Sequence, residues 1–228
     1  MSTIVFSCKE QDILIKRKPN PRAKRLSLRM SARDNGFILA IPPRTTDFHI
    51  NAFLARCRPW IEKSLSKLFH VKQLSPGEEL ALYGIPFQCI LDPLRRKPIL
   101  CAVTQTLRLP PQCPQKALHE LLKKIAMEKL TPYVMTVAQI LGQHLEKVRF
   151  RDTKSRWGSC SAQKMISLNW RLILAPPEVA QYVCVHEAVH LLHMNHSKAF
   201  WKTVEELCPA YKDHKKWLKA HGFSLMRV

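Results

Sequence analysis

The chain has 228 residues, of which 46% are hydrophobic and 24% are charged. This length and composition support one large domain or two small lobes with an apolar core, and they exclude a mostly disordered chain. No stretch approaches the roughly 20 uncharged apolar residues that a membrane-spanning helix needs. The first residues lack the pattern of a secretory signal, and the eight cysteines are dispersed without a C-x-x-C pair. We therefore expect a cytoplasmic protein without a membrane association.

The net charge of +20 is unusual, and it is spread over both halves of the sequence. Residues 1–114 carry 19 basic and 8 acidic side chains, and residues 115–228 carry 18 and 9. A basic protein attracts polyanions, so nucleic acid is a candidate partner and an anionic molecule is a candidate substrate. General solubility would explain the charge equally well, because charge does not determine fold or chemistry.

The first part of the chain predicts a β-rich region with one helix. Alternating segments predict three strands at Asp12–Lys16, Arg25–Met30 and Phe37–Ile41, the last after an Asp34-Asn35-Gly36 turn. Apolar residues at helical spacing predict a helix over residues 46–69, and residues 80–109 return to short strands. The prolines at 110, 111 and 114 suggest a boundary between a region at 1–110 and a domain at 115–228. No internal repeat is evident.

The second part predicts a long amphipathic helix, a short sheet and a buried helix. The long helix covers Gln115–Leu141, and alternation around residues 165–172 predicts a half-buried strand. Pro176-Pro177 opens a helix that we expect to run through His193, since proline is tolerated in the first helical turn. The overall expectation is an α+β fold.

The sequence His186-Glu187-Ala188-Val189-His190 is an H-E-x-x-H motif inside this last helix. Histidines at i and i+4 share one helix face, about 6 Å apart along the axis, so both imidazoles can reach one metal ion. Zinc is the ion that this motif predicts, and Glu187 is placed to take a proton from a metal-activated water. Histidines that are only hydrogen-bonded in a core are the alternative, but buried polar groups are costly without partners.

A third ligand is needed for a catalytic zinc site, and two histidines are candidates. His193 lies about 10 Å from His186 along the helix axis, too far for one ion to reach both. His196 is better placed if the helix ends near Asn195, and Ser197 can cap a following helix. We therefore predict a metal site of His186, His190 and His196.

The segment from His186 to Trp201 resembles the YgjP-like family of predicted metal-dependent hydrolases. Arg156-Trp157-Gly158-Ser159-Cys160-Ser161 and Leu168-Asn169-Trp170-Arg171-Leu172 are similar to other signatures of that family. The resemblance is dense between residues 147 and 217 and weaker before residue 115. It implies a zincin-like metallopeptidase domain, zinc on the residues equivalent to His186, His190 and His196, and Glu187 as the base.

Three further residues are candidates for substrate binding. The guanidinium groups of Arg156 and Arg171 can bind a carboxylate or phosphate, or steady an oxyanion, and Asn169 lies in the same signature segment. Structural ion pairs are the alternative for both arginines. We also expect the strand at Met165–Leu172 to be an edge strand that pairs with an extended peptide.

These observations predict a zinc-dependent hydrolase, most simply a metallopeptidase acting on a peptide. One alternative is a phosphohydrolase of nucleoside triphosphates, although such enzymes favour oxygen-ligated Mg²⁺ over a histidine-rich zinc site. Another is a nucleic-acid-associated protein with a structural zinc, although structural sites are usually closed and rich in thiolates.

Overall fold

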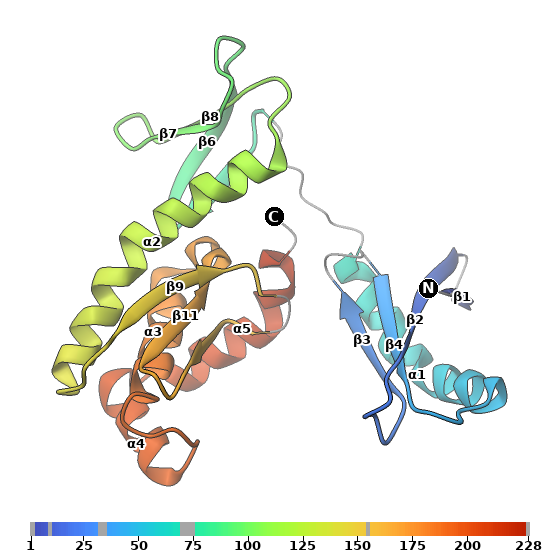
Figure 1. Cartoon of the computed structure of the whole chain (residues 1–228). Helices are drawn as coiled ribbons and strands as arrows, with labels where there is room; N and C mark the ends of the chain where they lie inside the picture. Colours follow the sequence, from blue (N-terminus) through green and yellow to red (C-terminus); the bar gives the residue numbers. More distant parts are fainter. Residues whose placement is uncertain (1–2, 9–10, 32–35, 69–75, 154–155, 227–228) are drawn as a thin grey trace. The chain divides into compact units, whose positions relative to one another are not determined.

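A computed structural model describes residues 3–8, 11–31, 36–68, 76–153 and 156–226. It shows the α+β fold that the sequence predicts, with a β-rich N-terminal region (Figure 1). The chain divides into two compact units, Met1–Lys72 and Gln73–Met226. The division precedes the proline cluster, so the strands between residues 79 and 109 belong to the second unit. None of the described helices is long and apolar enough to cross a membrane.

The first unit is a four-stranded sheet with one helix. Its elements are β1 (Thr3–Cys8), β2 (Gln11–Pro19), β3 (Ser27–Ser31), β4 (Gly36–Ile41) and α1 (Asp47–Leu68). The strand order is β1-β2-β4-β3, with β2 and β4 parallel and the other pairs antiparallel. The turn expected at residues 34–36 falls partly outside the described residues.

Alternation of side chains gives this sheet one buried face. Ile13 and Ile15 on β2 are buried, as are Phe37 and Leu39 on β4. The ring of Phe37 contacts Trp60 of α1 edge-on, with centroids 5.7 Å apart, so this is the face that the helix covers. Helix α1 contributes buried Ile50, Leu54, Ile61 and Leu65.

The second unit begins with another four-stranded sheet and continues into the region of the H-E-x-x-H motif. Its strands and helices are β5 (Glu79–Leu82), β6 (Ile85–Leu91), β7 (Ile99–Cys101), β8 (Thr106–Leu109), α2 (Gln115–Ile140), β9 (Lys147–Arg151), β10 (Gly158–Cys160), β11 (Met165–Asn169), the 3-10 helix η1 (Trp170–Leu174), α3 (Pro177–Val189), α4 (Lys198–Leu207) and α5 (Tyr211–Leu225). Helix α2 matches the predicted long helix within one residue.

The two four-stranded sheets repeat one topology. The second has the order β5-β6-β8-β7, again with a parallel central pair, and each sheet is followed by a helix. The registers also agree: Pro19 pairs with Ile41 at the end of β2 and β4, and Leu91 pairs with Leu109 at the end of β6 and β8. The unit of four strands and a helix therefore occurs twice in the chain.

The same turn follows the second strand of each copy. The Asn20 amide donates to the Ile41 carbonyl at 2.8 Å, and the Asp92 amide donates to the Leu109 carbonyl at 2.8 Å. The side-chain oxygens of Asn20 and Asp92 each accept from an amide two residues later, at 3.0 and 3.2 Å. The expectation of no internal repeat is therefore wrong. Few side chains are identical between the copies, whereas topology, register and turn geometry coincide.

A three-stranded sheet of order β10-β11-β9 lies next to α3. Strand β11 is its central strand, antiparallel to β10 and parallel to β9. The expectation that the strand beginning at Met165 is an edge strand is therefore wrong, because both of its edges are paired. The edge nearer to α3 is β10, and after Asn169 the chain turns into η1 instead of continuing as a strand.

Helix α2 joins the parts of the second unit into one core. In Figure 1 it runs between the β5–β8 sheet and the elements that follow it. It contacts α3, η1 and β9, and its buried residues are Leu118, Leu122, Ile125, Ala126, Leu130, Val134, Val137 and Ala138. The Tyr83 amide also donates to the Ile173 carbonyl at 2.6 Å, which ties the β5–β6 turn to η1. This core supports the helix that carries the motif.

Candidate metal centre

Helix α3 carries His186 and Glu187 in a strongly apolar environment. It starts with Pro177 in its first turn and ends at Val189, with His190 as its C-cap. The predicted helix was four residues longer. It ends early because the chain changes to tight turns: the Leu191 amide bonds to the Ala188 carbonyl at 2.9 Å instead of continuing the helical pattern.

The structure brings His186, His190 and His196 together. One ring nitrogen from each lies within 4.8 Å of the corresponding nitrogens of the other two. The Nε2 atoms of His186 and His196 are 3.1 Å apart. Two nitrogens that bind one tetrahedral zinc at 2.0–2.1 Å are separated by about 3.3 Å, so this pair fits a shared ion.

Two contacts hold the segment that carries His196. The ammonium group of Lys164, from the turn between β10 and β11, donates to the Leu191 carbonyl. Ser197 is the N-cap of α4, and its hydroxyl accepts from the Phe200 amide at 3.3 Å. The predicted cap at Ser197 is thereby confirmed, and it fixes where the chain turns immediately after His196.

Aromatic rings of α4 pack against the three histidines. The ring centroid of Phe200, which is fully buried, lies 5.0 Å from that of His186, 4.6 Å from His190 and 4.8 Å from His196. Trp201 stacks against His196 at 5.7 Å. These contacts limit the rotation of the imidazoles, so the cluster is positioned by packing as well as by the backbone.

The tautomer of His190 is determined by a backbone carbonyl. Its Nδ1 lies 3.0 Å from the carbonyl oxygen of His193. A carbonyl can only accept, so Nδ1 carries the proton and Nε2 keeps a lone pair. Metal-binding histidines characteristically donate their second ring N–H in this way. His193 therefore contributes its backbone to the cluster, and its ring is not among the three that converge.

Burial favours the neutral imidazole at His186 and His190. Burial, followed by the charges of His190, His196 and Lys215, lowers the pKa of His186 to about 4. Burial is also the main cause that lowers the pKa of His190. Neutral imidazole is the form that binds a metal ion, so the environment favours the ligating state.

Glu187 is a buried carboxyl group, with 6% of its surface exposed. Burial raises its pKa to about 7, against the opposing effect of the positive charge of Arg156. A carboxyl with a pKa near neutrality can both accept and return a proton, which suits a general base. Of the three candidate substrate-binding residues, Arg156 is thus the one whose charge reaches Glu187.

Because Gly158 of β10 has no side chain, the Glu187 side chain can occupy the space beside it. A Cβ atom at this position would overlap Glu187 and lie only 2.5 Å from its Oε1. At Gly222 of α5 a Cβ would lie 2.9 Å from the indole Cζ2 of Trp157. The sequence alone does not identify the partner of Gly158. The partner is the carboxylate of the motif, and Trp157 is fitted against α5.

Asn169 and Arg171 are buried, and they stabilise the fold where β11 ends and η1 begins. The Asn169 amide group donates to the Thr153 carbonyl at 2.8 Å, and its oxygen accepts from the Arg171 backbone at 3.0 Å. The Arg171 guanidinium pairs with Asp152 and lies 4.2 Å from the ring centroid of Trp170. These contacts give both residues structural roles. Contact with a substrate stays a prediction for Arg156, Asn169 and Arg171.

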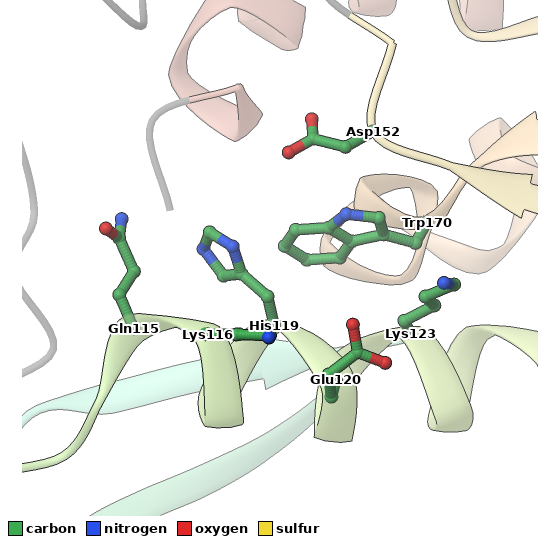
Figure 2. Close-up of a pocket in the computed structure, with 7 residues that line it drawn as sticks. All are labelled: Gln115, Lys116, His119, Glu120, Lys123, Asp152 and Trp170. Atoms are coloured by element: carbon green, nitrogen blue, oxygen red, sulfur yellow. The ribbon is translucent and has the colours of Figure 1, made fainter.

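A separate pocket of about 300 Å³ lies at the start of α2. Figure 2 shows the His119 ring beside the indole of Trp170, with centroids 4.9 Å apart. The pocket is lined by Gln115, Lys116, His119, Glu120, Lys123, Asp152 and Trp170. None of the three clustered histidines is in this lining, so the pocket is distinct from the metal centre.

The second unit is a mixed α+β domain in which an H-E-x-x-H helix and a third histidine converge, an arrangement that fits a metal-dependent hydrolase. The YgjP-like metallopeptidase domain matches residues 24–221, so the chain belongs to the YgjP-like family of metal-dependent hydrolases. Among solved structures it is similar to the metallopeptidase zymogen of Pyrococcus abyssi abylysin. The identity is 26% over 40% of this chain and 93% of that chain, with a TM-score of 0.37. No curated protein matches the chain.

Proposed function

We propose that the chain is a zinc-dependent peptidase in which His186, His190 and His196 bind the ion and Glu187 is the general base. The observation that carries the proposal is the convergence of three ring nitrogens within 4.8 Å, next in sequence to a buried carboxyl group. The donor set supports zinc, since imidazole nitrogen suits zinc and oxygen ligands suit magnesium.

The residues of the chain have defined tasks in this proposal. When bound, zinc supplies a Lewis acid that lowers the pKa of a coordinated water to about 7. The carbonyl of His193 keeps the Nε2 lone pair of His190 available. Glu187 takes a proton from the attacking water and later returns it to the leaving nitrogen, for which a pKa of about 7 is suited.

Strand β10 is the edge that we propose for the substrate. Among the described residues it pairs with β11 alone, and its first residue, Gly158, abuts Glu187. An extended peptide that added to the outer edge of β10 would use backbone hydrogen bonds, as in other cases of β-strand addition. The scissile bond would then lie beside the general base. A compact nucleotide would not need an open strand edge for binding, so this edge favours a peptide substrate.

Substitution of Glu187 by Gln tests the base and the bond together. Glu187→Gln keeps the size of the side chain and removes its basicity, so the variant should keep its metal and lose hydrolysis. Wild type and variant are assayed on a peptide library and on a panel of nucleoside triphosphates. Glu178→Gln is the matched control, because Glu178 is an exposed residue in the first turn of the same helix.

Peptide hydrolysis that disappears in Glu187→Gln and persists in Glu178→Gln supports the proposal. Peptide hydrolysis unchanged by Glu187→Gln contradicts the role of Glu187. Nucleotide hydrolysis alone, lost in Glu187→Gln, would show that the substrate class is wrong while the base is right. Loss of metal in Glu187→Gln would instead give Glu187 a structural role.

A further inference from the structure

The positive charge is concentrated in the first compact unit. Residues 1–72 carry 15 basic and 5 acidic side chains, and residues 73–228 carry 22 and 12. These two stretches of sequence therefore each have a net charge of +10, but the first has fewer than half as many residues. Division of the sequence at residue 114 conceals this difference, because it assigns part of the second unit to the first.

Within the first unit the charge lies on β2, β3 and the loop between them. Residues 13–33 contain eight basic and no acidic side chains. Lys16 and Lys18 are exposed and alternate along β2 with buried Ile13 and Ile15. They therefore project from the face of the sheet opposite to α1, since successive side chains of a strand point to opposite faces.

The registers bring Arg29 close to these lysines, and the loop that directly follows β2 adds further cations. Lys16 on β2 and Arg29 on β3 both pair with Ile38 of β4, so they flank one residue of the central strand, about 10 Å apart. The β2–β3 loop carries three further exposed cations. We call this set the basic surface: Lys16, Lys18, Arg22, Lys24, Arg25 and Arg29.

The second copy of the fold lacks an equivalent surface. Its loop places Arg96 and Lys97 where the first copy has Lys24 and Arg25. However, the turn residue of the second copy is Asp92, whose carboxylate lies 3.6 Å from the Arg95 guanidinium and 3.5 Å from that of Arg108. The first copy has the neutral residue Asn20 at this position. The same loop is thus partly neutralised in one copy and fully cationic in the other.

We propose that the basic surface binds the phosphate backbone of duplex nucleic acid without sequence preference. Charge complementarity selects the partner, because duplex DNA carries about one negative charge per 1.7 Å of its axis and is neutralised by lysine and arginine. The described residues of the open sheet face are aliphatic, small, hydroxylic or charged, and no aromatic ring lies there for stacking of unpaired bases. Backbone contacts with a duplex are therefore the mode that fits.

Two charge reversals at equivalent loop positions test the proposal. The full-length chain is titrated into a fluorescein-labelled duplex of about two helical turns, and anisotropy is read from about 50 to 200 mM salt. Lys24→Glu/Arg25→Glu removes two phosphate contacts, so it should lower the slope of log K against log salt by about 2 and weaken binding at low salt by at least about tenfold. Arg96→Glu/Lys97→Glu changes the net charge equally and should retain the wild-type slope.

Three results would overturn the proposal. The first is that the wild-type chain does not bind the duplex at the lowest salt concentration, which would show that the basic surface does not bind duplex nucleic acid. Equal losses in the two variants would show a diffuse effect of net charge. Competition by polyglutamate as effective as that by unlabelled duplex would identify an acidic protein as the partner. Lys24→Gln/Arg25→Gln, which only neutralises the loop, should lower the slope by the same amount. It keeps the test valid if the reversed variant unfolds.

Discussion

The two copies of the four-stranded unit share one backbone plan and differ in what is attached to it. In the second copy, α2 packs on its own sheet and on α3, η1 and β9, so its buried residues belong to the core around the metal centre. In the first copy, α1 and its sheet form a compact unit by themselves. The comparison shows that the same plan can either share a core with the helix of the histidine cluster or form a compact unit by itself.

The family match begins within the first copy and ends in α5, so it spans both units. Both copies are thus parts of the YgjP-like domain. If the division of roles is correct, damage to the second copy should affect the metal centre, and damage to the first should affect binding of polyanions.

Equivalent leucines provide the largest expected effect. Leu54 of α1 and Leu122 of α2 are both buried, with 1% and 0% of their surfaces exposed. Substitution of either by Ala should lower the free energy of unfolding of its unit by about 2–5 kcal/mol. Leu122→Ala should also lower metal content, since Leu122 shares a core with Val185 and Ala188 of α3. Leu54→Ala should leave metal content unchanged.

Elemental analysis and denaturation followed by fluorescence measure these effects. Trp60 is the single tryptophan of residues 1–72, so a Trp60→Phe background separates the unfolding of the two units. Release of metal by Leu54→Ala as complete as that by Leu122→Ala would show that the two copies do not have separate roles.

Two glycines of the second unit provide the next effect. Gly158→Ala places a methyl group against the Glu187 carboxylate. On the substrate whose hydrolysis depends on Glu187, this variant should therefore have a kcat lower by on the order of a hundredfold, while it retains its metal. Gly222→Ala should have a smaller effect, because its clash is with the Trp157 ring and reaches Glu187 only indirectly. Kinetics and metal content of both variants check this order. A larger loss in Gly222→Ala would disprove direct positioning by Gly158.

The smallest effect comes from exchange of the two turn residues. Asn20→Asp and Asp92→Asn both keep a side chain that can form the turn, so each should change the free energy of unfolding by less than about 1 kcal/mol. Asn20→Asp should weaken duplex binding, because it introduces an acid next to the basic surface. Asp92→Asn should strengthen it slightly by releasing Arg95 and Arg108. The anisotropy titration measures both, and no change in Asn20→Asp would count against the comparison.

The local pattern of the sequence predicted the elements that depend on short-range chemistry. Helix α2, the H-E-x-x-H helix and the cap at Ser197 follow from apolar spacing, proline and capping preference. The third histidine was chosen by helix geometry, and His196 does converge with the other two. The end of α3 was misplaced, because tight turns continue the apolar pattern beyond Val189.

The features that depend on pairing between distant segments could not be read from the sequence. The strand that starts at Met165 alternates like an edge strand, but its central place follows from pairing with β9 and β10. The proline cluster suggested a domain boundary. In both copies, however, a proline pair marks only the turn from strand to helix, at Pro42-Pro43 and Pro110-Pro111. The partner of Gly158 was equally hidden, since only the fold brings β10 to Glu187.

Zinc affinity of His196→Ala measured beside His193→Ala tests the central claim most directly. His196 offers a ring nitrogen to the cluster, and His193 offers its backbone carbonyl to His190. Competition with a chelating dye should therefore show a loss of at least about a hundredfold for His196→Ala, larger than the 10–100-fold typical of indirect contacts. His193→Ala should stay close to wild type. Equal losses in the two variants, or a loss in His193→Ala alone, would contradict the proposed set of His186, His190 and His196.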